Sequence, residues 1–304
     1  MSISGYSSGD FLFTEDAYYM FPASSEQERN ILHIRELDFN SGKLQDVTLI
    51  ENGQLYVSSD QTNSGTCLFL VQIADDKQNS QRLYTLTADK NLGTIYDSAQ
   101  IGLTAPEFSA LSAGEDTIFL LRQTVQAEQL ITEIVEMDLN GAIRRTIALP
   151  GLEDYSEDDY FADKLYVVDE YIFIKWYDCG ERLPYFSAFR IVDGKAKKLE
   201  TPQNAPCYLL TKELVKDRYL LFSAFPDEMD YSAKIYTSHL YAFDTLDDQF
   251  IGISLPLAQK VVFNDMVCNE YGDIVMNIVE ETGTRSTTRN RTIRIDFDDL
   301  ERLL

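Results

Sequence analysis

The sequence is poor in positive charge. It contains 26 lysine and arginine residues against 50 aspartate and glutamate residues, which gives a net charge of −24. Nucleic-acid binding depends on lysine and arginine side chains that neutralise phosphates, and attraction to anionic membrane surfaces depends on the same residues. The composition therefore argues against nucleic acids and anionic membranes as partners.

Long apolar runs are also absent. No stretch approaches 18 uncharged apolar residues, so no membrane insertion is expected. The first ten residues, MSISGYSSGD, lack the basic and apolar regions of a signal peptide. The chain as it stands is expected in the cytoplasm, and it would be extracytoplasmic if an N-terminal anchor had been trimmed. Its localisation stays unknown.

Cysteine, histidine, glycine and proline are all scarce. The chain has 15 glycines and 8 prolines with 44% hydrophobic residues, which is typical of a folded globular protein. Two histidines are too few for a histidine-rich metal centre. The cysteines are far apart without C-x-x-C spacing, and we expect unpaired thiols in place of disulfides or zinc ligands. They are Cys67, Cys179, Cys207 and Cys268.

What the chain does contain is an internal repeat of about 51 residues, and such a repeat decides the fold. An extended run of about eight residues ends in an aspartate and a turn six times, at Asp38, Asp89, Asp138, Asp193, Asp244 and Asp296. A nearly continuous apolar run precedes each of them and begins at Tyr18, Leu68, Ile118, Tyr171, Tyr219 and Asp273. Turn residues such as Asn-Gly and Asp-Gly between extended runs indicate hairpins.

Each repeat carries four strand signals, and six such units fill the chain. The sequence therefore predicts an all-β fold, a six-bladed β-propeller with four-stranded antiparallel blades, as a single domain over 1–304. The blades are expected at about 10–50, 51–100, 107–149, 159–199, 205–254 and 260–304. We expect the residue before each turn aspartate to occupy one repeated environment. These residues are Leu37, Ala88, Met137, Val192, Phe243 and Ile295. Residues 2–6 are expected to close the ring as the fourth strand of the last blade.

The recurring pattern of an aromatic-aliphatic strand, a loop, and a strand that ends in Asp and a glycine turn resembles six-bladed propellers of the TolB-like and low-density-lipoprotein-receptor-like kind. The resemblance covers nearly the whole chain at the level of architecture. The Tyr-Trp-Thr-Asp signature of the receptor type is absent, and Tyr236-Thr237 is its nearest counterpart. A resemblance of architecture implies no particular activity.

One loop face of such a propeller is expected to carry exposed aromatic rings and carboxylates, as recognition surfaces do. The candidate ligand-binding residues on it are Tyr155, Tyr160, Trp176, Tyr177, Asp178, Asp227, Asp230 and Tyr231. No catalytic residue and no metal ligand is assigned. Oxygen-rich acidic loops can take calcium, but no calcium-loop motif is present, so no cofactor is expected.

These observations favour a non-catalytic β-propeller, a binding or scaffold module that recognises a protein, peptide or glycan through one loop face. The alternative is a propeller enzyme that acts on carbohydrate or lactone substrates with carboxylates at the mouth of the channel. Carboxylates that converge on a channel pocket would favour the enzyme, and an apolar channel would favour the binding module.

Overall fold

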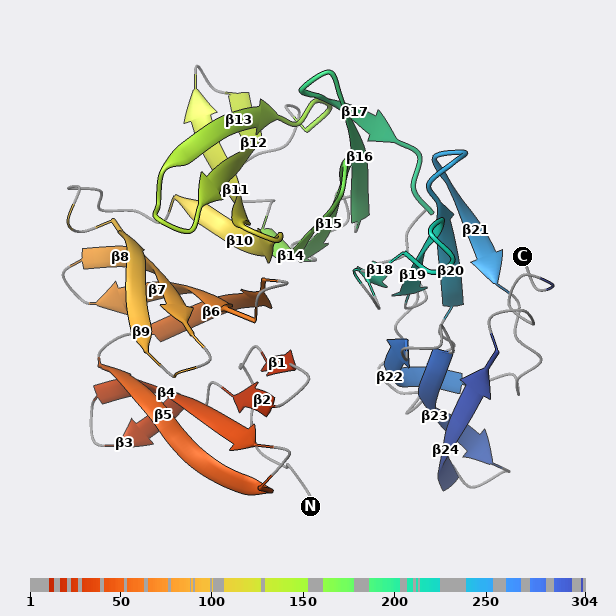
Figure 1. Ribbon diagram of the computed structural model, residues 1–304, viewed down its shortest axis with the longest axis horizontal. Coiled ribbons are helices and arrows are strands. Elements are labelled where there is room, and N and C mark those ends of the chain that lie inside the picture. Colours follow the sequence, from red (N-terminus) through yellow and green to blue (C-terminus); the bar gives the residue numbers. More distant parts are fainter. Residues whose placement is uncertain are drawn as a thin grey trace. The chain divides into compact units, whose positions relative to one another are not determined.

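The computed structural model is all-β, with no α-helix in the residues that it describes (Figure 1). These residues lie between 11 and 302 and exclude 101–106, 153–160, 178–185, 203–206, 225–238, 254–260, 269–273, 283–286, 297–301 and shorter stretches. The chain forms two compact units. The first consists of Met1–Asp158, Ala162–Val167 and Asp193–Ala196, and the second of Asp159–Phe161, Val168–Val192 and Lys197–Leu304.

The described strands form six antiparallel sheets, numbered here along the chain. Sheet 1 contains β1 (Phe11–Phe13), β2 (Ala17–Met20), β3 (Ala23–Glu26), β4 (Arg29–Asp38) and β5 (Lys43–Glu51). Sheet 2 contains β6 (Gln54–Gln61), β7 (Cys67–Asp75), β8 (Gln78–Leu86) and β9 (Leu92–Asp97). Sheet 3 contains β10 (Phe108–Ala113), β11 (Thr117–Gln126), β12 (Gln129–Asp138) and β13 (Ile143–Ala148).

Sheet 4 contains β14 (Phe161–Val168), β15 (Tyr171–Tyr177), β16 (Phe186–Val192) and β17 (Lys195–Leu199). Sheet 5 contains β18 (Cys207–Leu209), β19 (Tyr219–Ala224), β20 (His239–Asp244) and β21 (Gln249–Ile253). Sheet 6 contains β22 (Val261–Cys268), β23 (Ile274–Thr282) and β24 (Thr287–Ile295).

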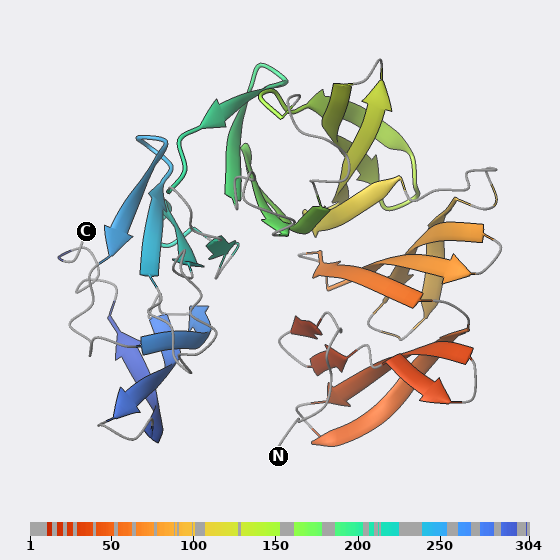
Figure 2. The same ribbon diagram turned by 180° about the vertical axis from the view of Figure 1, so that it is seen from behind.

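Strands that follow one another in the chain are neighbours in sheets 2 to 6, so each sheet is a simple meander. The two opposite views show the same order, with β10 and β13 at opposite edges of sheet 3 (Figures 1 and 2). In sheet 1, β2 and β3 pair with the two halves of β4, and β5 pairs with its other edge. Together β2 and β3 therefore take the place of one strand. The prediction of an all-β fold built from four-stranded antiparallel sheets is confirmed.

Sheet 6 has three strands in the described part of the chain. The sequence predicts that residues 2–6 supply the fourth, and these residues lie outside the described ones. Ring closure through the N-terminus therefore stays a prediction.

The apolar faces of sheets 2 and 3 share one core in the first unit. Leu68, Leu70 and Leu83 from sheet 2 cluster with Phe108, Leu111, Ile118, Leu120, Val135 and Met137 from sheet 3. Two hydrogen bonds connect the first strands of sheets 2, 3 and 4. The Ala113 N–H in β10 donates to Asp60 Oδ2 in β6 at 2.7 Å, and the Val167 N–H in β14 donates to Ser112 Oγ in β10 at 3.0 Å. In each contact a side chain of one sheet accepts a hydrogen bond from a backbone N–H of the next sheet.

Cys67 is a free, buried thiol at the start of β7. Burial raises its pKa to about 12, and the nearby carboxylates of Glu36 and Asp60 contribute to this rise. For this cysteine the prediction of an unpaired thiol is confirmed. The side chains of Cys179, Cys207 and Cys268 lie outside the described residues.

In three sheets the strand before the last one, which is β4, β12 or β20, ends in an aspartate. The carboxylate of this aspartate accepts hydrogen bonds from the turn that follows it. Asp38 Oδ1 accepts the Ser41 N–H at 2.9 Å, Asp138 Oδ1 accepts the Asn140 and Ala142 N–H groups at 2.9 Å each, and Asp244 Oδ1 accepts the Leu246 N–H at 3.0 Å. A short carboxylate can bond to the backbone of its own turn in this way. The repeated aspartate in the sequence therefore has a structural cause.

In sheets 2 and 4 another residue occupies this position. Strand pairing places Thr87 there in sheet 2, where its N–H donates to the Asn91 carbonyl at 3.2 Å. In sheet 4 the position belongs to Arg190, which pairs with Tyr171 as Asp244 pairs with Tyr219. The strand β16 continues two residues further, to Val192, and turns at Asp193-Gly194. Both turn residues have positive φ, 51° and 76°, as a two-residue type I′ turn requires.

The prediction of one repeated environment for the residue before each turn aspartate is therefore wrong for Val192, and Ala88 lies outside the described residues. This side chain is 47% exposed, whereas Met137 is 3% exposed and Phe243 is fully buried. Phe189, which pairs with Ile172 and is also fully buried, takes the equivalent place in sheet 4. The alignment by aspartates failed because the turn of sheet 4 is shorter and lies further along the chain.

The turn between β12 and β13 packs against sheet 2. A Cβ atom at Gly141 would lie 3.0 Å from the Ile95 carbonyl oxygen in β9, and Gly141 has a φ of 88°. Leu139 from the same turn packs on the core shared by sheets 2 and 3. This position therefore requires glycine for two reasons, its positive φ and the close approach of β9.

Gly141 and Gly194 make a matched pair for a stability test, because Gly194 has a φ of 76° and a Cβ atom added there would meet nothing within 4 Å. We expect Gly194→Ala to lower the free energy of unfolding by about 1 kcal/mol through backbone strain alone. Gly141→Ala should cost about 2 kcal/mol, because β9 must also shift. Urea unfolding followed by circular dichroism measures both. Equal losses would contradict the close packing of this turn on β9.

Candidate functional site

The sequence placed Trp176 at the centre of an exposed recognition surface, and the structure corrects this. Trp176 lies in β15, its side chain is 1% exposed, and its Nε1–H donates to Ser187 Oγ in β16 at 2.9 Å. The alternation of side chains along a strand turns this ring into the interior. An interior indole cannot serve as an exposed anchor.

The other predicted binding residues are not placed by the structure. Tyr177 ends β15, but its side chain is not described. Tyr155, Tyr160, Asp178, Asp227, Asp230 and Tyr231 lie outside the described residues. The structure therefore does not show whether these residues come together.

The described residues of the second unit include a cluster of aromatic side chains. Phe173 in β15 lies at the centre, with ring centroids at 5.0 Å from Phe222, 5.2 Å from Phe243 and 6.1 Å from Phe186. Phe250 in β21 adds a ring 4.9 Å from Phe243. Phe222 and Phe243 meet Phe173 edge to face, an arrangement that aromatic quadrupoles favour, whereas Phe186 stacks on it. The cluster joins the apolar faces of sheets 4 and 5.

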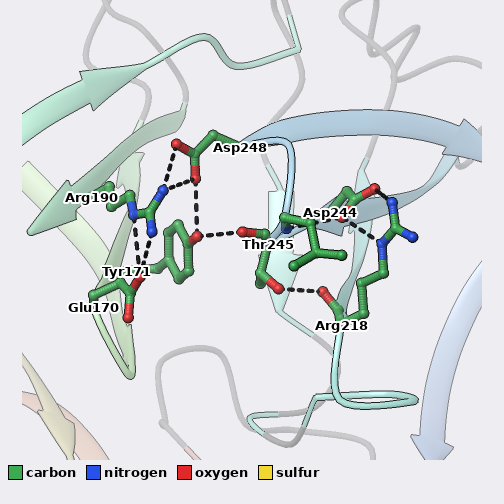
Figure 3. A network of polar contacts seen from close by, with 8 residues as sticks. Glu170, Tyr171, Arg190, Arg218, Asp244, Thr245 and Asp248 are labelled. Carbon is green, nitrogen blue, oxygen red and sulfur yellow. Dashed lines mark hydrogen bonds and ion pairs between the residues drawn. The ribbon is translucent and has the colours of Figure 1, made fainter.

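A polar network contacts this cluster through Tyr171, and Figure 3 shows the residues of the network. The Tyr171 ring packs edge to face on Phe243 at 5.0 Å, and its hydroxyl lies 2.8 Å from the Thr245 carbonyl oxygen and 2.9 Å from Asp248 Oδ1. Both partners belong to the turn between β20 and β21. A residue of sheet 4 therefore holds the turn of sheet 5.

Arg190 strengthens the same connection. Its Nη1 donates to both carboxylate oxygens of Asp248, at 3.0 and 3.2 Å, and its Nε and Nη2 donate to Glu170 Oε1 at 3.2 and 2.8 Å. The guanidinium also lies over the Tyr171 ring, 5.5 Å from the ring centroid. One arginine thus donates hydrogen bonds to two carboxylates and places its positive charge over an aromatic ring.

A second arginine holds the turn from within sheet 5. Arg218 Nε donates to Asp244 Oδ1 at 2.8 Å, and Nη2 donates to the other carboxylate oxygen. The Arg218 carbonyl accepts both the Thr245 N–H at 3.1 Å and the Thr245 hydroxyl at 2.8 Å. Asp244 is almost completely buried, so its charge depends on this pairing.

The electrostatics of the network favour a structural role. Burial, assisted by the hydrogen bond to Asp248, raises the pKa of Tyr171, so its phenol stays protonated. Hydrogen bonds to Asp248 and Glu170 raise the pKa of Arg190, and the bond to Arg218 lowers the pKa of Asp244. Tyr171 and Arg190 therefore keep their protons, and Asp244 stays ionised in its pairing with Arg218.

Sequence reasoning missed this network. The available signal was the position at the end of the third strand, where Arg190 replaces an aspartate that is repeated in other sheets. The sequence repeat was aligned on Asp193 in sheet 4, although the equivalent position is Arg190, so the replacement of aspartate by arginine was not seen.

No group of three or more His, Cys, Asp or Glu side chains in the described ranges has a geometry that could hold a metal ion. In the same part of the chain, no helix is long and apolar enough to span a membrane.

No protein-family model matches the sequence, and no curated protein matches it either. Solved structures do. The β-propeller domain of the Trilobed protease from Pyrococcus furiosus matches 97% of this chain and 82% of its own, with 13% identity and a TM-score of 0.55. An acylaminoacyl peptidase from Pyrococcus horikoshii matches 95% of this chain and 44% of its own, with 12% identity and a TM-score of 0.56. Hydrazine synthase from Kuenenia stuttgartiensis matches 98% and 86%, with 11% identity and a TM-score of 0.50.

These likenesses confirm the β-propeller fold. They also overturn the functional prediction from the sequence, a non-catalytic binding or scaffold module that recognises a protein, peptide or glycan, with a carbohydrate or lactone enzyme as its alternative. Among the structures that this chain resembles are propellers of peptidases. The sequence prediction failed because a repeat of strands specifies the fold and leaves open which protein carries it.

The Tyr171 hydroxyl provides a first test of the network. We expect Tyr171→Phe to lower the free energy of unfolding by about 1 kcal/mol, because the Thr245 carbonyl and Asp248 lose a shared partner. Trp176, the single tryptophan, is buried in the same unit, so its fluorescence in urea measures the change. A loss below about 0.3 kcal/mol would show that the turn is held without this hydroxyl.

The carboxylate of Asp244 provides a test by pH. Its pKa is lowered in the folded state, so its stabilising contribution is present above the pKa of an unfolded aspartate, about 3.9, and is lost as the pH falls below that value. We expect Asp244→Asn to destabilise the protein strongly at pH 7 and progressively less below pH 4, in urea unfolding at each pH. A difference that does not change with pH would contradict the charged pairing with Arg218.

Proposed function

We propose that this propeller works as the propeller domain or subunit of a peptidase. The observation that carries the proposal is the likeness to propeller domains of peptidases over 93–97% of the chain. The narrower resemblance to TolB-like propellers concerns the same architecture and adds no activity of its own.

The proposal assigns hydrolysis to a catalytic centre outside the described residues. This chain spans 44% of the length of the acylaminoacyl peptidases that it matches, so more than half of each of those chains lies outside the match. The propeller itself would form a rigid structure beside that catalytic centre. Contacts between neighbouring sheets make it rigid, namely those of Asp60 and Ser112 with backbone groups and the Arg190–Asp248 ion pair.

The test is to isolate the tagged chain under native conditions from the cell that encodes it. We expect hydrolysis of aminoacyl- and acylaminoacyl-p-nitroanilides to co-elute with the chain at a constant ratio through size-exclusion and ion-exchange columns. A tagged Phe222→Asp variant, which places a charge in the aromatic cluster of the second unit, is the control and should lose the activity. Peptidase activity that separates from the intact chain would contradict the proposal.

A further inference from the structure

A groove lies in the first unit beside the short turn of sheet 4. It has a volume of about 490 Å³, within the range of about 300–1,000 Å³ that is usual for ligand sites. Its lining comes from three short segments, Leu130–Thr132 of β12, Thr146–Pro150 at the end of β13, and Gly194–Ala196. Leu130, Ile147 and Leu149 make its floor apolar and buried.

The groove exists because the turn beside it is short. The turn of sheet 3 at Gly141 packs on the edge strand of sheet 2, at Ile95, the fourth residue of β9. The equivalent residue on the edge strand of sheet 3 is Thr146, the fourth residue of β13. Thr146 lines the groove together with Gly194 of the shorter turn of sheet 4. The two-residue turn leaves open the place that a longer turn would fill.

A second difference leaves a polar atom unpaired in the same place. In sheet 2, Gln81 bonds through its side chain to Glu107 and Phe108, and its carbonyl accepts the Ser98 N–H at 2.9 Å. Thr132 has the same backbone bond in sheet 3, from the Leu149 N–H at 2.8 Å. Its hydroxyl, however, is buried and has no hydrogen-bond partner among the described residues, and the residue is 2% exposed. A buried hydroxyl without a partner is costly, which indicates a ligand that supplies one.

The remaining features indicate what the ligand is. β13 is the edge strand of sheet 3, so its outer backbone groups have no partner strand among the described ones, and an extended chain can pair with such an edge. Lys195 is an exposed cation at the groove in a protein of net charge −24, which favours a carboxylate there.

We propose that this groove binds the carboxyl-terminal end of an extended peptide with aliphatic side chains. Its aliphatic groups contact Leu130, Ile147 and Leu149, its backbone bonds to Thr132 and to the edge of β13, and its terminal carboxylate pairs with Lys195. The choice of a peptide as ligand rests on the proposed function, whereas the groove and its unpaired hydroxyl do not.

The test measures fluorescence anisotropy of an N-terminally labelled Gly-Leu-Val-Leu peptide, with a free carboxyl terminus or amidated. We expect the free peptide to bind at least fivefold more tightly than the amide. Lys195→Glu should abolish this preference, and Lys197→Glu, an exposed charge on the same strand outside the groove lining, should leave it unchanged. Thr132→Val should weaken both peptides.

Ala196→Trp, at a half-buried position of the lining, fills the groove and should weaken both peptides at least tenfold with an unchanged Tm. Pro150→Trp, at an exposed position of the lining, replaces it if that Tm falls. Equal binding by the wild-type protein and the filled variant, or no binding by the wild type, overturns the inference. If peptidase activity accompanies the chain but filling the groove changes nothing, this inference alone fails. If peptides bind in the groove and no peptidase activity accompanies the chain, the proposed function alone fails.

Discussion

The turn that follows the third long strand must reach the neighbouring sheet, and much of the structure depends on how it does so. In the first unit the turn at Gly141 packs directly on Ile95, where no side chain fits. In the second unit the turn at Thr245 and Asp248 is held by Tyr171 and Arg190. Each sheet has an apolar face that must be covered, and these turns seal the end of the shared core.

The same constraint explains why sheet 4 differs. Arg190 replaces the turn aspartate, the strand continues, and the chain turns in only two residues at Asp193-Gly194. One consequence is that the Arg190 side chain binds Asp248 in the turn of sheet 5 and not the turn that follows its own strand. The other is a groove beside the short turn, with the unpaired Thr132 hydroxyl in its wall. A local change in turn length therefore produces both a stabilising contact and a candidate binding site.

The fold could be predicted from the sequence because the repeat is strong at the buried strands. Runs such as those beginning at Leu68, Ile118 and Tyr219 are core strands in the structure. The site could not be predicted, because turn length and strand register are properties of pairing. Val192 and Phe189 are both apolar, and only the pairing of Phe189 with Ile172 shows which one is buried. Trp176 was predicted to be exposed for the same reason, because the sequence near the end of a strand does not show to which face of the sheet an aromatic side chain points.

The most direct test of this account changes the turn itself. Replacing Asp193-Gly194 by the Leu-Asn-Gly sequence of residues 139–141 gives sheet 4 a turn of the kind that packs on Ile95 in sheet 2. Peptide affinity and Tm are then measured on the same protein. The account predicts loss of affinity for the free-carboxylate peptide with a Tm that is unchanged or raised. Unchanged affinity in a variant that folds normally would contradict it.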